Sequence, residues 1–277
     1  MKMKLLGTLG QSPARRSRAP SEALRKQSAR KQASGVPSSA RGLFGVPEQA
    51  PRTSAKTAPK MDKRAQFFPY KDETARHSFP YVTISLIALN VLVFLWSLTN
   101  FESVINTFGF VPAAASLLTI FTSMFLHGGL DHILGNMLYL WIFGDNIEDK
   151  FGKIFFIVFY LLAGLAASLT HWLTNIGSAV PAIGASGAIS GVLGIYVVLF
   201  PKARIRTIGR FGLITVSAWM MIGLWFLIQL LLGSASLLGG QGSGIAFWAH
   251  VGGFVFGFVV TLALKVSGIV KVEGKKK

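Results

Sequence analysis

The sequence predicts an all-α membrane protein, with a bundle of six transmembrane helices behind a disordered basic tail. Only 14% of the 277 residues are charged and 51% are hydrophobic, whereas a soluble domain carries roughly a quarter charged residues. The charges are also clustered, since none occurs between Lys153 and Lys202 or between Arg210 and Lys265. Each of these gaps, about fifty residues, accommodates two spans of roughly twenty residues and a turn.

The basic charge and the missing cysteines exclude several classes of function. The net charge of +17 does not indicate nucleic-acid binding, because more than half of the Lys and Arg residues precede residue 80 instead of covering a folded surface. The sequence contains no cysteine, which excludes disulfides, thiol catalysis and cysteine-bound zinc.

Residues 1–78 are rich in Ser, Ala, Pro, Arg and Lys and show no helical period, which predicts a disordered tail. We favour a tail attracted to anionic lipid headgroups, with an organellar transit peptide as the alternative. A membrane domain is expected over 79–268 and a short basic tail over 269–277. Both tails are expected in the cytoplasm, at a bacterial inner membrane or, as the alternative, an organellar inner membrane.

Basic clusters mark the cytoplasmic side of a membrane, and two spans fit between each neighbouring pair of clusters. The segment 113–126 is then an interfacial stretch on the outer side, and 144–150 and 202–210 are inner loops. The connection 233–244 is either a movable cap over the site or an ordinary loop. The expected spans are 81–99, 130–143, 154–173, 184–200, 211–232 and 245–266.

Polar groups inside spans are costly and usually functional, and a few of them share one depth here. His132 and Asn136 lie four residues apart on one face of the second span. Ser186 and His250 lie near the outer ends of the fourth and sixth spans. Each group alone fits helix packing, because a membrane histidine or asparagine often bonds a neighbouring helix. Their convergence favours a site.

The segments HGGLDHILGN (127–136), GASG (184–187) and AHVGG (249–253) resemble the motifs of rhomboid intramembrane serine proteases. They occur in that family's order and on its second, fourth and sixth helices. The resemblance covers about 79–268 and implies a six-helix rhomboid-like bundle. By this resemblance Ser186 is the nucleophile, His250 its general base, and His132, Asn136 and the Ser186 N–H the oxyanion hole.

The resemblance also implies supporting roles for residues near these motifs. His127 is expected to be structural in the outer loop, and Glu148 to tie helix ends together at the inner side. Gly253 lets the sixth helix press against the fourth at Gly187, and Gly184 precedes the nucleophile in its motif.

One departure concerns Ser190, at a position where some members have a tyrosine that stacks on the catalytic histidine. We therefore expect packing alone to orient His250. The aromatic residues Trp219, Trp225 and Phe226 of the fifth span are expected to face lipid or the core.

These features predict an intramembrane serine endopeptidase that uses a Ser-His dyad to cleave transmembrane protein substrates near the outer membrane face. The expected partners are those substrates and the lipid bilayer, with no nucleic acid, no metal and no organic cofactor. The main alternative is a catalytically inactive rhomboid-like protein that binds membrane helices. A transporter would need polar residues through the whole bilayer depth, and a zinc protease would need a His-Glu-x-x-His motif.

Overall fold

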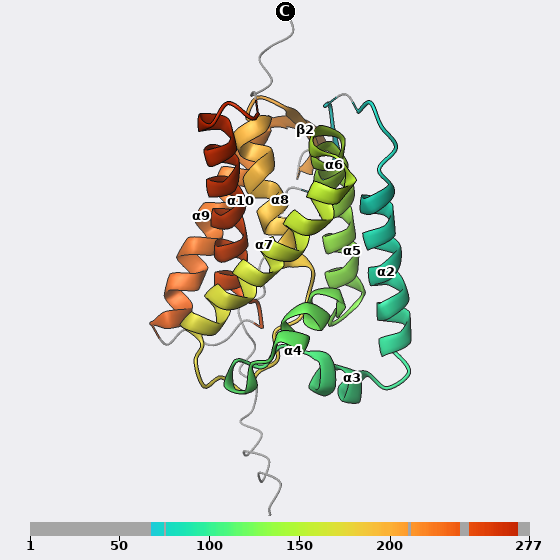
Figure 1. Cartoon of the computed structure of the whole chain (residues 1–277), viewed down its shortest axis with the longest axis vertical. Helices are drawn as coiled ribbons and strands as arrows, with labels where there is room; N and C mark the ends of the chain where they lie inside the picture. The colour runs from blue at the N-terminus through green and yellow to red at the C-terminus, as the bar shows by residue number, and fades with distance from the viewer. Residues whose placement is uncertain (1–67, 75, 210–211, 239–243, 271–277) are drawn as a thin grey trace, which may run out of the picture. The chain divides into compact units, whose positions relative to one another are not determined.

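Helices form most of the described chain (Figure 1). The structure is a computed structural model that describes residues 68–74, 76–209, 212–238 and 244–270. These residues belong to one unit, Thr57–Lys277, so most of the two predicted tails lies outside the described residues. The helical elements are α2 (Tyr81–Ser97), α3 (Phe101–Phe108), η3 (Pro112–Ala114), α4 (Leu117–Thr122), η4 (Ser123–Phe125), α5 (Leu130–Tyr139), η5 (Leu140–Gly144), α6 (Asp145–Phe151), α7 (Lys153–Thr174), α8 (Ser186–Leu199), α9 (Ala218–Leu237) and α10 (Phe247–Val266).

Long apolar helices make the chain a membrane protein. In the described residues, α7, α9 and α10 are each long and apolar enough to cross a membrane. A further candidate span is the pair 117–125 and 130–151, whose two halves meet at 90°. The helices α2 and α8 are apolar but shorter, with 17 and 14 residues. The bend separates the segment expected at the interface, 113–126, from the expected second span.

The expected loop 144–150 is helical, so that prediction was wrong. The helix α5 continues through the π-helical turn η5 into α6, which ends at Phe151. The charges that suggested a loop have partners inside the fold. Glu148 is 2% exposed and accepts hydrogen bonds from the backbone N–H groups of Val82 and Thr83 at 2.9 and 2.8 Å. It thereby satisfies the first turn of α2, where the helix dipole favours a negative charge.

The sequence did not predict the antiparallel sheet that β1 (Phe68–Asp72), β2 (Arg204–Gly209) and β3 (Gly212–Ser217) form among the described residues, in the order β1–β2–β3. Strand β1 falls within the predicted disordered tail, and β2 falls within the predicted basic loop, so both predictions were wrong at these residues. The fifth span was also misjudged. It begins at Ala218 because β3 precedes it, and it continues to Leu237.

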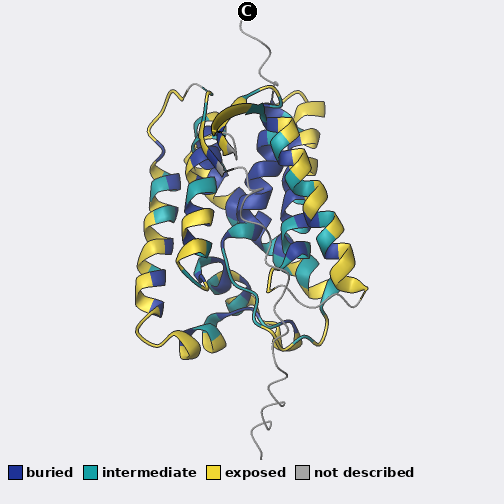
Figure 2. Ribbon diagram, turned by 180° about the vertical axis from the view of Figure 1, so that it is seen from behind, coloured by how far each residue is buried: buried dark blue, intermediate teal, exposed yellow. Residues whose placement is uncertain are grey.

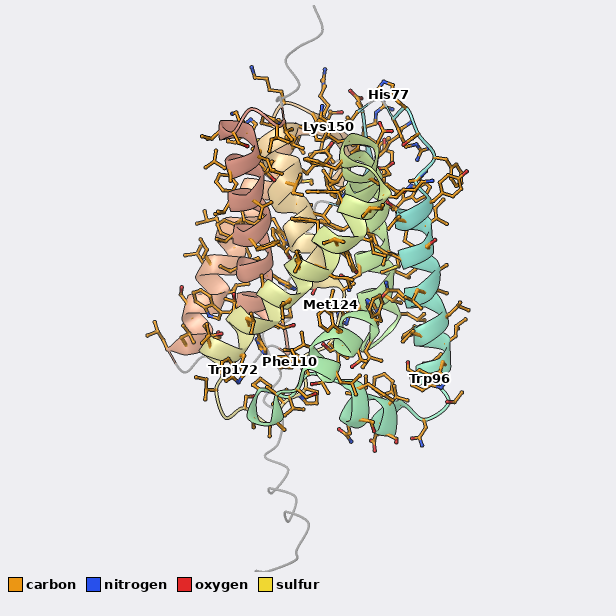
Figure 3. All side chains as sticks on the ribbon, viewed as in Figure 1. His77, Trp96, Phe110, Met124, Lys150 and Trp172 are labelled. Carbon is orange, nitrogen blue, oxygen red and sulfur yellow. The ribbon has the colours of Figure 1, made fainter. Side chains whose placement is uncertain are left out.

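The two ends of the bundle carry different side chains. Figure 3 shows His77 and Lys150 at one end, and Trp96 and Trp172 at the opposite end. The sheet lies at the first of these ends (Figure 1), which we call the sheet end; the other is the tryptophan end. Trp96 is 49% exposed and Trp172 is 36% exposed, as is typical of tryptophans at a membrane interface.

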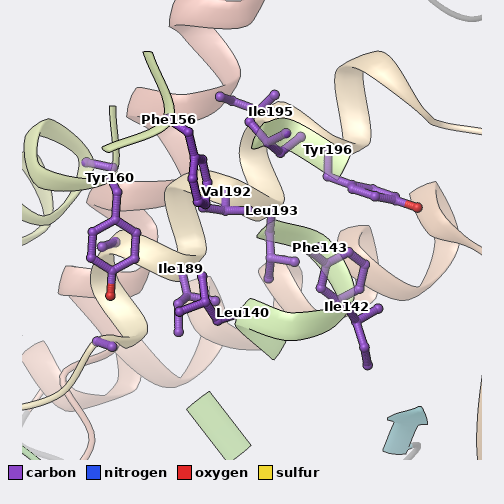
Figure 4. Close-up of a cluster of buried hydrophobic side chains, with 14 of the residues drawn as sticks. Leu140, Ile142, Phe143, Phe156, Tyr160, Ile189, Val192, Leu193, Ile195 and Tyr196 are labelled. Carbon is purple, nitrogen blue, oxygen red and sulfur yellow. The ribbon is translucent and has the colours of Figure 1, made fainter. Parts of the chain in front are cut away.

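The helix α8 runs through the centre of the buried core. Most of its residues are buried, and Figure 2 shows the buried residues gathered in the middle of the bundle with exposed residues around them. In Figure 4 the side chains of Ile189, Val192 and Leu193 lie among those of η5 and α7, including Leu140 and Phe156. These contacts on several sides fix the position of α8 and therefore the position of Ser186, its first residue.

Glycines bring α8 and α10 into backbone contact. A Cβ atom added at Gly253 would overlap the carbonyl oxygen of Gly187, and one added at Gly257 would overlap that of Gly191. On the other side of α8, a Cβ atom added at Gly187 would lie 2.6 Å from the Cβ atom of Ala167 on α7. Small residues allow such close approach between membrane helices, which sets the distance between α8 and α10.

Candidate active site

Ser186 is the first residue of α8, and the backbone just before it requires a glycine. Gly184 has a φ of +125°, a conformation that residues with a Cβ rarely adopt. Its N–H donates to the carbonyl of Ser123 at 2.9 Å, which anchors the turn to η4. The first N–H groups of a helix have no acceptor within the helix, so the start of α8 offers donors beside the Ser186 hydroxyl.

His250 of α10 lies beside this hydroxyl. Its Nε2 atom is 2.8 Å from Oγ of Ser186, within the range of a hydrogen bond. Its Nδ1 atom lies 2.8 Å from Oε1 of Gln229 on α9. The ring of Trp225, also on α9, is tilted by 38° with its centroid 5.9 Å away. Both imidazole nitrogens therefore have partners, and packing is not the sole restraint that the sequence had suggested.

His132 and Asn136 approach the site from α5. A Cβ atom added at Gly184 would lie 2.7 Å from Nε2 of His132 and 3.6 Å from Oγ of Ser186, so the imidazole and the hydroxyl flank the same point. The Nδ1 atom of His132 accepts from the N–H of Gly128 at 3.3 Å. Because Nδ1 accepts this bond, the ring proton of a neutral His132 is on Nε2, which can donate toward the serine.

Asn136 is 7% exposed, and its Nδ2 donates to the carbonyl of His132 at 3.1 Å. The amide group has two hydrogens, so one remains for a second acceptor. His127 is fully buried, and its ring meets that of His132 edge to face, with centroids 5.1 Å apart and an interplanar angle of 67°. This contact supports the orientation of His132.

A small cavity of about 30 Å³ adjoins Ser186. Its walls come from α7, from the turn before α8 and from the start of α10, and its polar lining includes His171 and Ser168 of α7. A water molecule needs about 10–15 Å³ of this kind of volume, so the cavity has room for water or for a small side chain beside the hydroxyl.

These residues fall within a segment that matches a known family. The family model for the rhomboid domain matches residues 114–266, which is more than half of the chain. The chain belongs to the rhomboid family.

Individual rhomboid proteins show the same similarity. "Rhomboid protease GluP" of Bacillus subtilis is 32% identical over 197 residues, covering 67% of this chain and 35% of that protein. "Rhomboid protein 1, mitochondrial" of Saccharomyces cerevisiae is 34% identical over 128 residues, covering 44% and 37%. The human "Presenilin-associated rhomboid-like protein, mitochondrial" is 34% identical over 128 residues, covering 44% and 34%. The matches thus span about a third of the length of these relatives.

Other sequence-predicted residues of this rhomboid hold the helices together. Glu148 joins α6 to α2, and Gly187 and Gly253 form the contact between α8 and α10. Ser190 is 1% exposed and donates to the carbonyl of Ser186 at 2.6 Å. Because this hydroxyl bonds within its own helix, it does not restrain His250 as an aromatic ring would.

Sequence reasoning missed two polar residues of this rhomboid site, Gln229 on α9 and His171 on α7. A usable signal was present, because each is a polar side chain within a largely apolar span, where such residues are usually functional. Both lie on odd-numbered spans, whereas the predicted site residues came from the second, fourth and sixth spans. Among the described residues, no three side chains of His, Asp or Glu are arranged to hold a metal ion.

Proposed function

We propose that this rhomboid is an intramembrane serine endopeptidase in which Ser186 and His250 form a catalytic dyad. The observation that carries the proposal is the 2.8 Å separation between Nε2 of His250 and Oγ of Ser186. His250 removes the hydroxyl proton as Oγ attacks a peptide carbonyl, and it then delivers that proton to the leaving amine. Water hydrolyses the resulting ester and regenerates the serine.

The tetrahedral oxyanion is proposed to bind donors from His132, Asn136 and the backbone N–H of Ser186. The position of His132 Nε2 near the turn of Gly184 and the free amide hydrogen of Asn136 support this assignment. Each such donor is worth about 3 kcal/mol in other serine hydrolases. His127 then acts through His132, because it contacts that ring and not the serine.

The proposed substrates are transmembrane proteins that present a small side chain at the cleaved bond. The cavity of about 30 Å³ beside Ser186 supports this preference, because it gives a small side chain room next to the hydroxyl. Backbone within a helix has its carbonyls bonded internally, so the substrate must unwind locally before Oγ can reach a carbonyl.

We further propose six spans: α2, α5 with α6, α7, α8, α9 and α10. The start of α2 and the end of α10 are then at the sheet end, on the inner side of the membrane, and Ser186 opens toward the outer face. The cationic side chains of the sheet end, such as that of Lys150 (Figure 3), support this orientation, because inner loops of membrane proteins carry an excess of Lys and Arg. Of the proposed bacterial and organellar inner membranes, the mitochondrial names of two relatives favour the organellar one.

A cleavage assay tests the proposal. The full chain is reconstituted in lipid vesicles with a transmembrane test substrate, alongside Ser186→Ala and the control Ser97→Ala. Ser97 is a buried serine on α2 that bonds the carbonyl of Phe94. Cleavage by the unsubstituted protein and the control, with none by Ser186→Ala, is the expected result. Substrate binding without cleavage by all three proteins indicates an inactive rhomboid-like protein that binds membrane helices.

A further inference from the structure

The imidazole of His250 is held from both sides. While Nε2 faces Ser186, Nδ1 lies 2.8 Å from Oε1 of Gln229. Gln229 is 7% exposed, so its amide is withdrawn from the surface of α9. A buried amide without a bonding partner is costly, and the bond to His250 offsets that cost.

The identity of the two atoms fixes the position of the imidazole proton. An amide oxygen accepts hydrogen bonds and does not donate, so Nδ1 of His250 carries the hydrogen in this contact. A neutral imidazole has one ring proton, which leaves a lone pair on Nε2. That lone pair points toward Oγ of Ser186, as a general base requires. The opposite tautomer would present an N–H to the hydroxyl and could not accept its proton.

We propose that Gln229 is a positioning residue that holds His250 in its base-competent tautomer and orientation. This inference rests on the proposed function and extends it from a dyad to a Ser-His-Gln array. When His250 takes the serine proton, the Nδ1–H group belongs to a cation, and hydrogen bonds from charged donors are about twice as strong as neutral ones. Gln229 therefore stabilises the protonated base as well as orienting the neutral one.

The helices packed against α10, namely α7, α8 and α9, carry no acidic residue that could replace this amide. The sequence has no Asp or Glu between Lys153 and Lys202 or between Arg210 and Lys265, which excludes a carboxylate on α7, α8 or α9 and along α10 up to Lys265. The hydroxyl of Ser190 donates to the carbonyl of Ser186, so it is not the partner of Nδ1. The amide oxygen is the acceptor that the structure presents to Nδ1.

The packing of α9 against α10 holds Gln229 in register with His250. One turn before Gln229, the ring of Phe226 stacks on that of Phe254 with centroids 4.2 Å apart. One turn after it, the indole N–H of Trp248 donates to the carbonyl of Gly233 at 3.0 Å. These contacts bracket the amide, although only 17% of the apolar stretch of α9 is buried. Contacts between α9 and α10 thus lie on both sides of the amide.

Steady-state kinetics of the reconstituted full chain test the proposal. Gln229→Met keeps the side-chain length and removes the acceptor, whereas Gln229→Glu keeps an acceptor oxygen. The control Leu231→Met introduces the same side chain at an exposed position of the same helix. We expect Gln229→Met to lower kcat about 10- to 100-fold, by analogy with metal-binding histidines that lose the hydrogen-bond partner of their second ring nitrogen. KM should stay near its original value, and Gln229→Glu should recover most of the turnover.

A spectroscopic measurement on the unsubstituted protein tests the contact without relying on a folded Gln229→Met variant. In ¹⁵N-histidine-labelled protein, the His250 signal is assigned by its loss in His250→Ala. The expected signature is a neutral ring protonated at Nδ1. A ring protonated at Nε2 in the unsubstituted protein overturns the proposal, even if Gln229→Met does not fold.

The outcomes separate this inference from the proposed function. Ser186-dependent cleavage together with an unchanged kcat in folded Gln229→Met overturns the positioning role alone. If the unsubstituted protein shows no Ser186-dependent cleavage, the proposed function fails, and the catalytic role of Gln229 fails with it. A lowered kcat with a stable KM, rescue by Gln229→Glu and an Nδ1-protonated ring together support the inference.

Discussion

Gly253 of α10 lies against the carbonyl oxygen of Gly187, the residue that follows Ser186 on α8. The contact connects the helix that carries the base to the helix that carries the hydroxyl. Gly253 places no side chain between the two backbones at this level, so the distance between Ser186 and His250 depends on the absence of a Cβ atom at Gly253.

Gly253→Ala is expected to destabilise the fold, because its Cβ atom overlaps a backbone carbonyl that cannot move without shifting α8. Overpacking of this kind costs about 1–3 kcal/mol, measured as the free energy of unfolding in mixed micelles. The matched control is Gly223→Ala on α9, where an added Cβ atom has no neighbour within 4 Å. Alanine is favoured over glycine in a helix by about 1 kcal/mol, so the control should be neutral or stabilising. Equal stability of the two variants would contradict the close contact.

Glu148→Gln is expected to lower stability by about 1–3 kcal/mol. The carboxylate accepts from the N–H groups of Val82 and Thr83 and from the Thr83 hydroxyl. An amide of the same shape turns one acceptor oxygen into a donor that faces these hydrogens. Thermal unfolding in detergent measures the loss. Glu102→Gln, at an exposed position in the first turn of α3, should change stability by less than about 0.5 kcal/mol. Indistinguishable losses in the two variants would argue against a role for Glu148 in fixing α2.

Gly184→Ala is expected to lower kcat/KM about 100-fold, the scale on which a misplacement of about 1 Å affects catalysis. The added Cβ atom would lie 2.7 Å from Nε2 of His132, so the imidazole must move away from the site. Gly177→Ala separates this effect from backbone strain. Gly177 also has a positive φ, +86°, but an added Cβ atom there meets no neighbour within 4 Å. Both variants should lose stability from strain of about 1–2 kcal/mol, and only Gly184→Ala should lose most of its activity.

Much of the membrane domain could be predicted from the sequence because apolar length and charge-free gaps are local signals. The helices α7 and α10 begin and end within two residues of the expected spans 154–173 and 245–266. The residue types of the candidate site were also recognisable. Ser186, His132 and His250 are polar groups at one depth in otherwise apolar segments, and the family resemblance implied the close helix contact at Gly253 and Gly187.

Features that depend on long-range pairing could not be predicted in this way. Strand β1 pairs with β2, which lies more than a hundred residues later, with Phe68 opposite Ile208 and Asp72 opposite Ile205. Neither segment shows the alternating hydrophobic pattern of a buried strand, and the arginines of β2 indicated a cytoplasmic loop. Gln229 was missed for a different reason. One amide in an apolar helix is a weak signal until its partner, His250, is located in space.

The measurement that tests the central claim most directly is the covalent labelling of Ser186 by a fluorophosphonate. The serine oxygen attacks phosphorus, fluoride leaves, and peptide mapping locates the adduct. If His250 activates Ser186, the adduct forms on Ser186 in the unsubstituted protein and falls sharply in His250→Ala. Labelling at another residue, or undiminished labelling of Ser186 without the imidazole, would contradict the account.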